Sequence, residues 1–313
     1  MKIVFMEAET LGEDIDFKAF NNLGDVELYT RASTIEENAE RIKDADIIVV
    51  NKIPVNEELL KDATNLKMIA LSATGTNNID FEYTNSRNII VKNVVGYSTD
   101  SVVQHTFAML FYLYEKLATY DRFVKNGHYS KYHMFSCFTP HFSELKGKTW
   151  GIIGLGAIGR GVAKIASAFG CNVIYYSTTG KNKSSDFRQV SLDTLLSESD
   201  IVSLHCALTD TTHHIINENT LGMMKSNAIL LNLGRGPLID EQALATALDN
   251  CTIGAAGLDV LSVEPIAADN PLNNIKDTDK LLITPHMAWG TIEARARCVS
   301  EVYNNISNFI SSI

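Results

Sequence analysis

Three residues of this sequence stand in a pattern that could do chemistry on a carbonyl group. Arg235 follows the apolar run 229–231, Glu264 lies in the segment GLDVLSVEP, and His286 follows the apolar run 281–283. A guanidinium can hold a carboxylate bidentately, an imidazole can carry a proton near neutral pH, and a carboxylate can orient that imidazole and favour its protonated form. Because strands of an open α/β sheet present ligands at their carboxyl ends, the three side chains are expected to converge.

Each of the three residues also has a simpler interpretation. Arg235 could form a surface ion pair, Glu264 could be a solvated loop acid, and His286 could cap a helix or pack in a core. All three, however, follow strands of one predicted sheet, and this shared position favours a catalytic set over three unrelated structural roles.

A glycine motif precedes these residues in the segment GIIGLGAIGRGVAKIASAFGCNVIYYS. A strand at 149–153 leads into a turn at Gly154, Gly156 permits close approach of a pyrophosphate, and Gly159 lets the following helix pack on the sheet. The N–H groups that open this helix would face the phosphates. The motif predicts a dinucleotide-binding unit, with a purely structural glycine turn as the alternative.

The residue after the second strand of this unit departs from the usual pattern. An acid normally accepts hydrogen bonds from the ribose hydroxyls there, whereas this chain has Ser177, followed by Thr178 and a loop that contains Lys181 and Lys183. Hydroxyls and cations could accommodate a 2′-phosphate that a carboxylate would repel. Both NAD and NADP are therefore expected as coenzymes, and the loop slightly favours acceptance of NADPH. The alternative is that the loop is only polar and solvated and does not contact the coenzyme.

Composition limits the remaining classes of function. A chain of 313 residues with 45% hydrophobic content is long enough for two cores. The net charge of −10 argues against nucleic acid as a partner. The five cysteines are dispersed, as in a reduced cytoplasmic protein, and neither they nor the histidines form a metal set. The N-terminal apolar segment is too short for a signal sequence and no apolar run has membrane-spanning length, so no membrane association and a cytoplasmic location are expected.

Short apolar runs alternate with helical segments twice along the chain, which predicts an α/β fold with parallel sheets. A long amphipathic helix is expected at about 100–117, and a C-terminal helix carries an apolar stripe that we attribute to packing. The expected strands of the first series are 3–6, 26–29, 47–50, 68–71 and 89–92, and those of the second are 149–153, 173–176, 201–204, 229–231, 255–258 and 281–283.

The segments GLGAIG, NLGRGPLIDEQAL, GLDVLSVEP and ITPHMAW, in this order and spacing, resemble the D-isomer-specific 2-hydroxyacid dehydrogenases. The resemblance extends over essentially the whole chain. Within that family, MEAETLGEDID, SATGTNNID and the tryptophan after PHMA look most like the glycerate dehydrogenases, also called hydroxypyruvate reductases. The resemblance implies NAD(P)H-dependent reduction of a small 2-oxoacid, with hydroxypyruvate or glyoxylate expected.

The resemblance also implies roles for individual residues. It makes Arg235, Glu264 and His286 the catalytic trio, and it places Asp259 near the nicotinamide. The other implied coenzyme contacts, besides the glycine turn, Ser177 and Thr178, are Ala157, Ile158, Cys206, Thr212, Leu233 and Gly234. The implied substrate contacts, besides Arg235, are Ala73, Thr74, Gly75, Thr76 and Trp289. Trp289 could limit substrate size or could instead be a core anchor, and His105, His205, His213 and His214 are expected to be structural or solvent-facing.

The family architecture implies two Rossmann-like or flavodoxin-like domains, with the nucleotide-binding domain inserted into the substrate domain. The substrate domain would comprise residues 1–100 and 287–313, and the nucleotide-binding domain residues 101–286. Hinges are expected near 95–99 and 286–290, and a homodimer is expected through the nucleotide domain. Two alternatives stay open: a D-lactate-type dehydrogenase with another substrate preference, and a nicotinamide-sensing binding protein that resembles a transcriptional corepressor.

Overall fold

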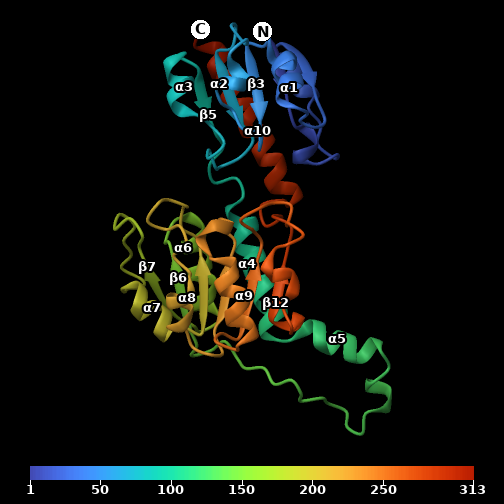
Figure 1. Ribbon diagram of the computed structural model, residues 1–313, viewed down its shortest axis with the longest axis vertical. Helices are drawn as coiled ribbons and strands as arrows, with labels where there is room; N and C mark the ends of the chain where they lie inside the picture. The colour runs from blue at the N-terminus through green and yellow to red at the C-terminus, as the bar shows by residue number, and fades with distance from the viewer. The chain divides into compact units, whose positions relative to one another are not determined.

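The computed structural model describes residues 1–313, which form two compact units (Figure 1). Unit 1 comprises Met1–Ser98 and Gly290–Ile313, and unit 2 comprises Thr99–Trp289. The chain therefore crosses from unit 1 to unit 2 and back once, so that unit 2 is an insertion in unit 1. The crossings lie within a few residues of the boundaries expected from the sequence.

Unit 1 contains a five-stranded parallel sheet in the order β2-β1-β3-β4-β5. Two of its inner strands, β3 and β4, are buried along their whole length, as their uninterrupted apolar sequences IIVV and MIAL require. The strands are β1 (Lys2–Phe5), β2 (Asp25–Leu28), β3 (Ile47–Val50), β4 (Met68–Leu71) and β5 (Ile90–Lys92).

The C-terminal helix α10 (Ile292–Ser311) returns to unit 1 and contacts β4. Its buried residues recur at helical spacing, so the apolar stripe is a packing surface, and Tyr303 contacts Phe20 edge-on at 5.4 Å between ring centroids. The other helices of unit 1 are α1 (Ile35–Ile42), α2 (Glu57–Leu60) and α3 (Phe81–Ser86), with 3-10 turns η1 (Ala8–Leu11) and η2 (Lys18–Asn22).

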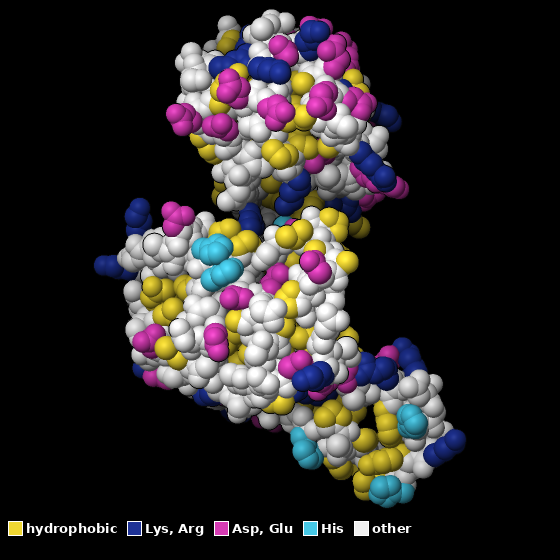
Figure 2. Space-filling model, in the orientation of Figure 1, with side chains coloured by type: hydrophobic (Ala, Val, Ile, Leu, Met, Phe, Trp, Pro, Cys, Tyr) yellow, Lys and Arg dark blue, Asp and Glu magenta, His cyan; other side chains and the backbone are white.

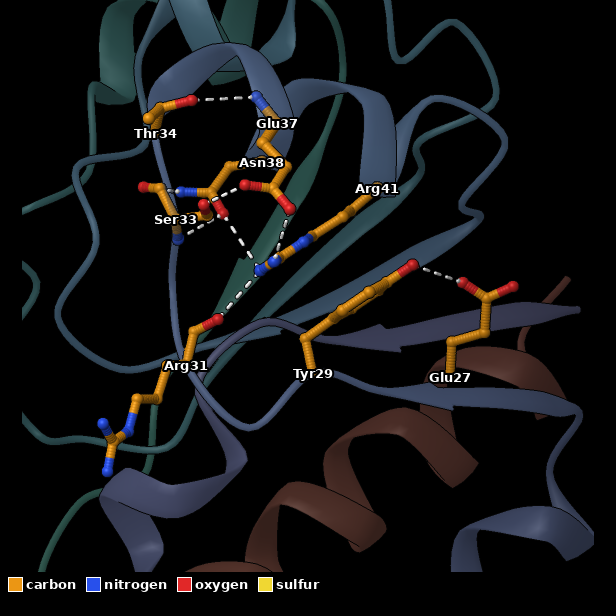
Figure 3. Close-up of polar contacts among 8 residues, drawn as sticks. All are labelled: Glu27, Tyr29, Arg31, Ser33, Thr34, Glu37, Asn38 and Arg41. Carbon is orange, nitrogen blue, oxygen red and sulfur yellow. Dashed lines mark hydrogen bonds and ion pairs between the residues drawn. The ribbon is translucent and has the colours of Figure 1, made fainter.

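A polar cluster joins the end of β2 to α1 (Figure 3). Thr34 caps the helix by accepting a hydrogen bond from the N–H of Glu37. Arg41 forms an ion pair with Glu37 at 3.1 Å, donates to the carbonyl of Arg31 at 2.8 Å and lies over the ring of Tyr29 at 4.4 Å. These contacts fix the β2–α1 connection and include none of the predicted site residues.

Unit 2 contains a seven-stranded parallel sheet in the order β12-β11-β10-β9-β6-β7-β8. The edge strand β8 was not predicted, because it has only two residues and both are polar and exposed. The strands are β6 (Thr149–Ile153), β7 (Asn172–Tyr176), β8 (Arg188–Gln189), β9 (Ile201–Leu204), β10 (Ile229–Asn232), β11 (Ala255–Leu258) and β12 (Leu281–Ile283).

Helix α4 (Thr99–Tyr114) is the long helix expected at about 100–117, although it ends three residues earlier. Its exposed residues Asp100, Gln104, Ala108 and Tyr112 recur every four positions on one side, and its buried residues lie on the opposite side, as an amphipathic helix requires. The buried side packs closely on α6, where a Cβ at Gly161 would lie 2.7 Å from Cγ2 of Val103. The other helices of unit 2 are α5 (Leu117–Lys125), α6 (Ala157–Ala168), α7 (Leu192–Glu198), α8 (Glu218–Gly222) and α9 (Glu241–Asp249), with 3-10 turns η3 (Tyr129–Lys131), η4 (Gly236–Leu238), η5 (Pro271–Asn274) and η6 (Thr278–Lys280).

Two apolar clusters form the core of unit 2. One contains Trp150 of β6, whose ring lies 5.0 Å from that of Phe107 of α4 and whose indole N–H donates to the buried hydroxyl of Ser203 at 2.9 Å. The other contains Leu204 and Leu230 and lies against α8 and α9 residues such as Leu244. None of the helices in either unit has both the length and the apolar composition needed to cross a membrane.

An arm made of α5 and residues 126–148 extends from unit 2 (Figure 1). Its base is held by Asp279, which pairs with Arg122 and accepts a hydrogen bond from Thr119 at 2.9 Å. Hydrophobic side chains gather on its surface (Figure 2), and Phe135 is 90% exposed. The alternation of strands and helices gave no signal for this arm.

Candidate active site

The glycine turn after β6 has the geometry that a bound dinucleotide requires. Gly154 has a φ of +96°, and a Cβ at this position would lie 2.6 Å from the backbone N of Cys206. A Cβ at Gly159 would lie 2.2 Å from the carbonyl oxygen of Gly154. A Cβ at Gly156, in contrast, would meet no atom within 4 Å, so the turn has open space where a pyrophosphate would lie.

Helix α6 begins directly after this turn, with Gly156 as its N-cap and without a side-chain cap. Its first turn contains no acidic residue, and the N–H groups of Ala157, Ile158 and Gly159 lack the intrahelical acceptors that later residues have. These N–H groups and the helix dipole suit the negative charge of a pyrophosphate. The residues present therefore fit a dinucleotide coenzyme.

Ser177 follows β7, where its hydroxyl oxygen is buried and has no hydrogen-bond partner. Thr178 is half-buried, whereas Lys181 and Lys183 are exposed. Arg160 of α6, which the sequence interpretation did not single out, donates to the carbonyl of Lys183 at 2.7 Å and so lies against this loop. The loop after Ser177 thus has a guanidinium against it at Lys183, and residue 177 itself carries a hydroxyl in place of the usual carboxylate.

The remaining predicted coenzyme contacts lie along the same edge of the sheet. Cys206 is a buried thiol whose pKa is raised to about 11 by burial, and its side chain packs in the core while its backbone contacts the Gly154 turn. The hydroxyl of Thr212 is used within its own turn, since it donates to the carbonyl of Ala207 at 2.8 Å. Leu233 is buried in the core beside α4.

A buried asparagine holds the loop that carries Arg235. Oδ1 of Asn232 accepts from the N–H of Gly234 at 3.0 Å, and its Nδ2 donates to the carbonyl of Arg235 at 2.9 Å. A Cβ at Gly236 would lie 1.9 Å from the carbonyl carbon of Leu261, so the loops after β10 and β11 are in tight contact. Arg235 itself is half-buried and uses one N–H on the carbonyl of Gly234, which leaves its other donors for a ligand.

Glu264 and His286 form a direct pair. Nδ1 of His286 lies 2.6 Å from Oε2 of Glu264, and Oε1 of Glu264 accepts from the backbone N–H of Leu261 at 2.9 Å. His286 has a φ of +51°, a left-handed conformation that few residues with a Cβ adopt. Its own N–H donates to the carbonyls of Asp259 at 2.8 Å and Thr284 at 2.9 Å, which hold the backbone in this conformation.

Asp259, expected near the nicotinamide, is 2% exposed and holds the His286 loop. Its carboxylate accepts from the hydroxyl of Thr284 at 2.6 Å and from the N–H groups of Met287 and Ala288, each at 2.9 Å. His105 of α4 lies against the same network, with Nε2 3.1 Å from Oγ1 of Thr284. His105 thus has a structural contact, which is one of the two roles expected for it.

The other histidines outside the catalytic trio are separate from this network. The ring nitrogens of His205 are buried without hydrogen-bond partners, and burial lowers the pKa of its imidazole to about 4. His213 and His214 stack on each other with ring centroids 3.9 Å apart.

The predicted substrate contacts outside the trio lie in two places. The loop 73–76 follows β4 of unit 1, where Oγ1 of Thr74 donates to the carbonyl of Val94 at 2.8 Å and the carbonyl of Ala73 accepts from the N–H of Val94 at 3.0 Å. Trp289 is half-buried and packs against the unit 2 core that contains Trp150. The loop is thus fixed by its neighbouring strand connection, and the tryptophan has at least one structural contact.

Comparison with known proteins identifies the family. A family model described as "D-isomer specific 2-hydroxyacid dehydrogenase, NAD binding domain" matches residues 107–288. The chain is 38% identical to a hydroxypyruvate reductase of Blautia hydrogenotrophica, with 99% of this chain and 97% of that protein covered.

Solved structures agree with this match. An acyclic imino acid reductase in complex with NADPH and D-arginine has a TM-score of 0.89 and 32% identity, with 100% of this chain and 98% of that chain covered. A D-lactate dehydrogenase of Aquifex aeolicus in complex with NAD and lactic acid has a TM-score of 0.85 and 29% identity, with 100% and 96% covered. The chain belongs to the D-isomer-specific 2-hydroxyacid dehydrogenases and is an oxidoreductase that uses a nicotinamide coenzyme.

Proposed function

We propose that this enzyme reduces hydroxypyruvate to D-glycerate reversibly, with glyoxylate as a further substrate. The observation that carries the proposal is the Glu264–His286 pair, which lies at the sheet edge that also bears Arg235 and the glycine turn. The likeness to a hydroxypyruvate reductase over nearly the whole chain supports the choice of substrate.

In this proposal Arg235 binds and polarises the substrate. The planar guanidinium donates to the substrate carboxylate and to the oxygen of the adjacent carbonyl, so that electron density is drawn away from the carbonyl carbon. When bound, the dihydronicotinamide ring supplies the hydride that this carbon accepts. The hydrogen bonds of Asn232 to the Arg235 loop keep the guanidinium in place without using its free donors.

His286 supplies the proton. Nδ1 is engaged with Glu264 at 2.6 Å, which leaves Nε2 for the substrate. As the carbonyl carbon is reduced, the proton on Nε2 passes to the carbonyl oxygen, the C=O π bond breaks and the O–H bond of the alcohol forms. The ring becomes neutral and is protonated again from solvent, and oxidation of the alcohol follows the same path in reverse.

The loop 73–76 and Trp289 are proposed to complete substrate recognition. Backbone N–H groups of the loop would bind the substrate carboxylate, because Gly75 lets the backbone approach a ligand closely. The indole of Trp289 would limit the room for the group on the third carbon of the substrate. The half-buried position of Trp289 is compatible with this use, since part of the ring is accessible.

We propose that the enzyme accepts NADPH as well as NADH. Ser177, with its unpartnered hydroxyl, stands where the usual acid would contact the ribose, and the guanidinium of Arg160 lies against the same loop at Lys183. A 2′-phosphate would accept hydrogen bonds from both groups and would meet no opposing carboxylate from residue 177. The NADPH complex of the similar imino acid reductase supports this assignment.

The arm is proposed to mediate homodimerisation. Phe135, Phe138, Phe142 and Val124 are all more than half exposed, and such apolar surface is typical of an interface. Replacing Phe135 and Phe138 together by Asp should yield monomers in sedimentation experiments. The matched change Leu28→Asp, at an exposed apolar residue outside the arm, should leave the dimer intact. A wild-type monomer at micromolar concentration would contradict the proposal.

A cytoplasmic location is part of the proposal. All five cysteines are free thiols, and three of them are buried. Unpaired cysteines are typical of proteins in a reducing compartment. Fractionation of cells that express a tagged copy should recover the protein with cytoplasmic markers, and recovery with an exported fraction would contradict this location.

Consumption of NADH and NADPH should be measured side by side with hydroxypyruvate, glyoxylate, pyruvate and bulkier 2-oxoacids. The proposal expects the highest kcat/KM with hydroxypyruvate. A clear preference for pyruvate or a bulkier 2-oxoacid would replace it with the D-lactate-type alternative. Coenzyme binding without turnover of any 2-oxoacid would favour a binding protein.

A further inference from the structure

His105 reaches the active-site loop from a distant part of the chain. It lies in the first half of α4, and its Nε2 is 3.1 Å from Oγ1 of Thr284, 179 positions later in the sequence. The same nitrogen is 3.7 Å from Oδ1 of Asp259. The side chain of Asp259 is 1% exposed and that of His105 is 19% exposed, so this contact is largely shielded from water.

The direction of the hydrogen bonds follows from the donors available. Oγ1 of Thr284 is 2.6 Å from Oδ1 of Asp259, and a carboxylate can only accept. The hydroxyl therefore gives its single hydrogen to Asp259 and accepts one from His105. This assigns the Nε2–H form to the contact, in a chain that runs from His105 through Thr284 to Asp259.

This chain of hydrogen bonds holds the segment that presents His286. Asp259 binds the N–H groups of Met287 and Ala288, just after His286, and Thr284 lies two residues before it. The left-handed backbone of His286 is unfavourable for a residue with a Cβ and persists only where neighbouring contacts enforce it. His105 is the member of this network that comes from a helix and not from the loops that follow β11 and β12.

We propose that His105 is a positioning residue for the reaction. By donating to Thr284 it fixes the Thr284–Asp259 contact, and through that contact the orientation of the His286 imidazole toward Glu264 and substrate. That His105 affects the reaction rests on the proposed role of His286 as proton donor. That His105 positions the His286 loop does not depend on that role.

Two variants separate hydrogen bonding from packing. His105→Gln keeps an N–H donor at about the same reach from the backbone, and His105→Leu fills similar space without a donor. We expect kcat to fall about tenfold in the Leu variant, the usual size of one lost hydrogen bond, with KM and the dissociation constant of the coenzyme within about twofold. The Gln variant should recover most of the wild-type kcat.

Equal loss in both variants, or a wild-type kcat in the Leu variant, would overturn the proposal. A fall in kcat that simply follows the unfolding midpoint of the variants would do so too. A double-mutant cycle with Thr284→Val adds a second check, because the two changes should be strongly non-additive if they break one hydrogen-bonded chain.

A readout without substrate keeps this test independent of the proposed function. The proton between Nδ1 of His286 and Glu264 can be followed by NMR in the protein without ligands. It should exchange faster with water in the Leu variant than in the wild type or the Gln variant. If wild-type protein reduces no 2-oxoacid but shows this pattern, the proposed reaction fails and the positioning role stands. Unchanged exchange in all variants would overturn the positioning role.

Discussion

Nδ1 of His286 lies 2.6 Å from Oε2 of Glu264, although the two residues follow different strands. The second oxygen of Glu264 is bound to the N–H of Leu261, so the carboxylate is anchored to its own loop and the imidazole is anchored to the carboxylate. The orientation of the ring therefore depends on two adjacent strands, β11 and β12, whose register is fixed by the sheet. Both partners of this pair are open to direct tests.

Removing the imidazole should abolish most of the turnover. His286→Ala is expected to lower kcat by about 10²–10⁴-fold, because that is the usual contribution of a positioned general acid. Coenzyme affinity, measured by fluorescence titration, should be unchanged. His213→Ala, at an exposed histidine outside the network, is the control and should retain full activity. Turnover near the wild-type level in His286→Ala would remove this residue from the mechanism.

Keeping the charge of residue 235 should not preserve its function. Arg235→Lys is expected to raise KM for the 2-oxoacid and to lower kcat, together by about 10-fold or more in kcat/KM, since an ammonium cannot reproduce bidentate geometry. Steady-state kinetics measure both constants. The control is Arg188→Lys, which changes an arginine of the edge strand β8 that pairs with Glu198 of α7, and it should leave both constants unchanged. If the dependence on substrate concentration is unaltered in Arg235→Lys, another group binds the carboxylate.

Coenzyme choice should respond to one side chain. Ser177→Asp restores a ribose acceptor and places negative charge beside the site of a 2′-phosphate, so the ratio of kcat/KM for NADH to that for NADPH should rise by about tenfold or more. Ser185→Asp introduces the same charge at an exposed position eight residues later and should leave the ratio unchanged. A constant ratio in both variants would mean that residue 177 does not contact the ribose.

Acid should destabilise unit 2 through His205. Burial lowers the pKa of this imidazole from 6.5 to about 4, so between these two values the unfolded chain binds a proton that the folded chain does not. Stability from this group is therefore complete above pH 6.5 and declines as the pH falls toward 4, by about 2–3 kcal/mol at pH 4.5. His205→Leu should reduce the loss of urea-unfolding free energy between pH 7 and 4.5 by that amount. His213→Leu is the control, and equal losses in wild type and His205→Leu would refute the assignment.

Trp289 should separate substrate size from stability. Trp289→Ala is expected to raise kcat/KM for bulky 2-oxoacids relative to hydroxypyruvate, with a smaller stability loss than the roughly 3–5 kcal/mol typical of a fully buried aromatic. A smaller loss of stability is expected because Trp289 is only half-buried. Specificity ratios and urea midpoints measured on the same variant decide between the two roles. An unaltered ratio with a large stability loss would make Trp289 a core anchor only.

The strands could be predicted because burial on both faces of a parallel sheet requires continuous apolar runs. The predicted ranges 47–50, 68–71 and 255–258 coincide with β3, β4 and β11. The arm could not be predicted in this way, because its aromatic residues follow neither the period of a buried strand nor that of a helix packed on a sheet. Helix α4 was predicted to within three residues of its end, but the close approach of α6 to its buried side could not be predicted, because the periodicity of one helix does not indicate which element packs against it.

The site divides along similar lines. Arg235, Glu264 and His286 could be selected because each has a distinctive chemistry and follows a strand. Their support could not be predicted. The hydrogen bonds of Asn232 to Gly234 and Arg235 depend on the backbone conformation of the loop that directly follows it, and His105 acts across 179 positions. Nothing in the local sequence around His105 indicates its partner. The left-handed conformation of His286 likewise depends on the hydrogen bonds that its N–H donates to the carbonyls of Asp259 and Thr284.

Within each unit, a hydrogen bond joins the segment where the chain enters the unit to the segment where it leaves. In unit 2, the hydroxyl of Ser101 donates to the carbonyl of Ala288 at 2.5 Å. In unit 1, the guanidinium of Arg297 donates to the carbonyl of Tyr97 at 3.0 Å. In each unit the segments where the chain enters and leaves thus lie side by side. A few linking residues would therefore suffice to join the two segments of unit 1 in the absence of unit 2. Unit 2 could in the same way be inserted into a loop of another protein.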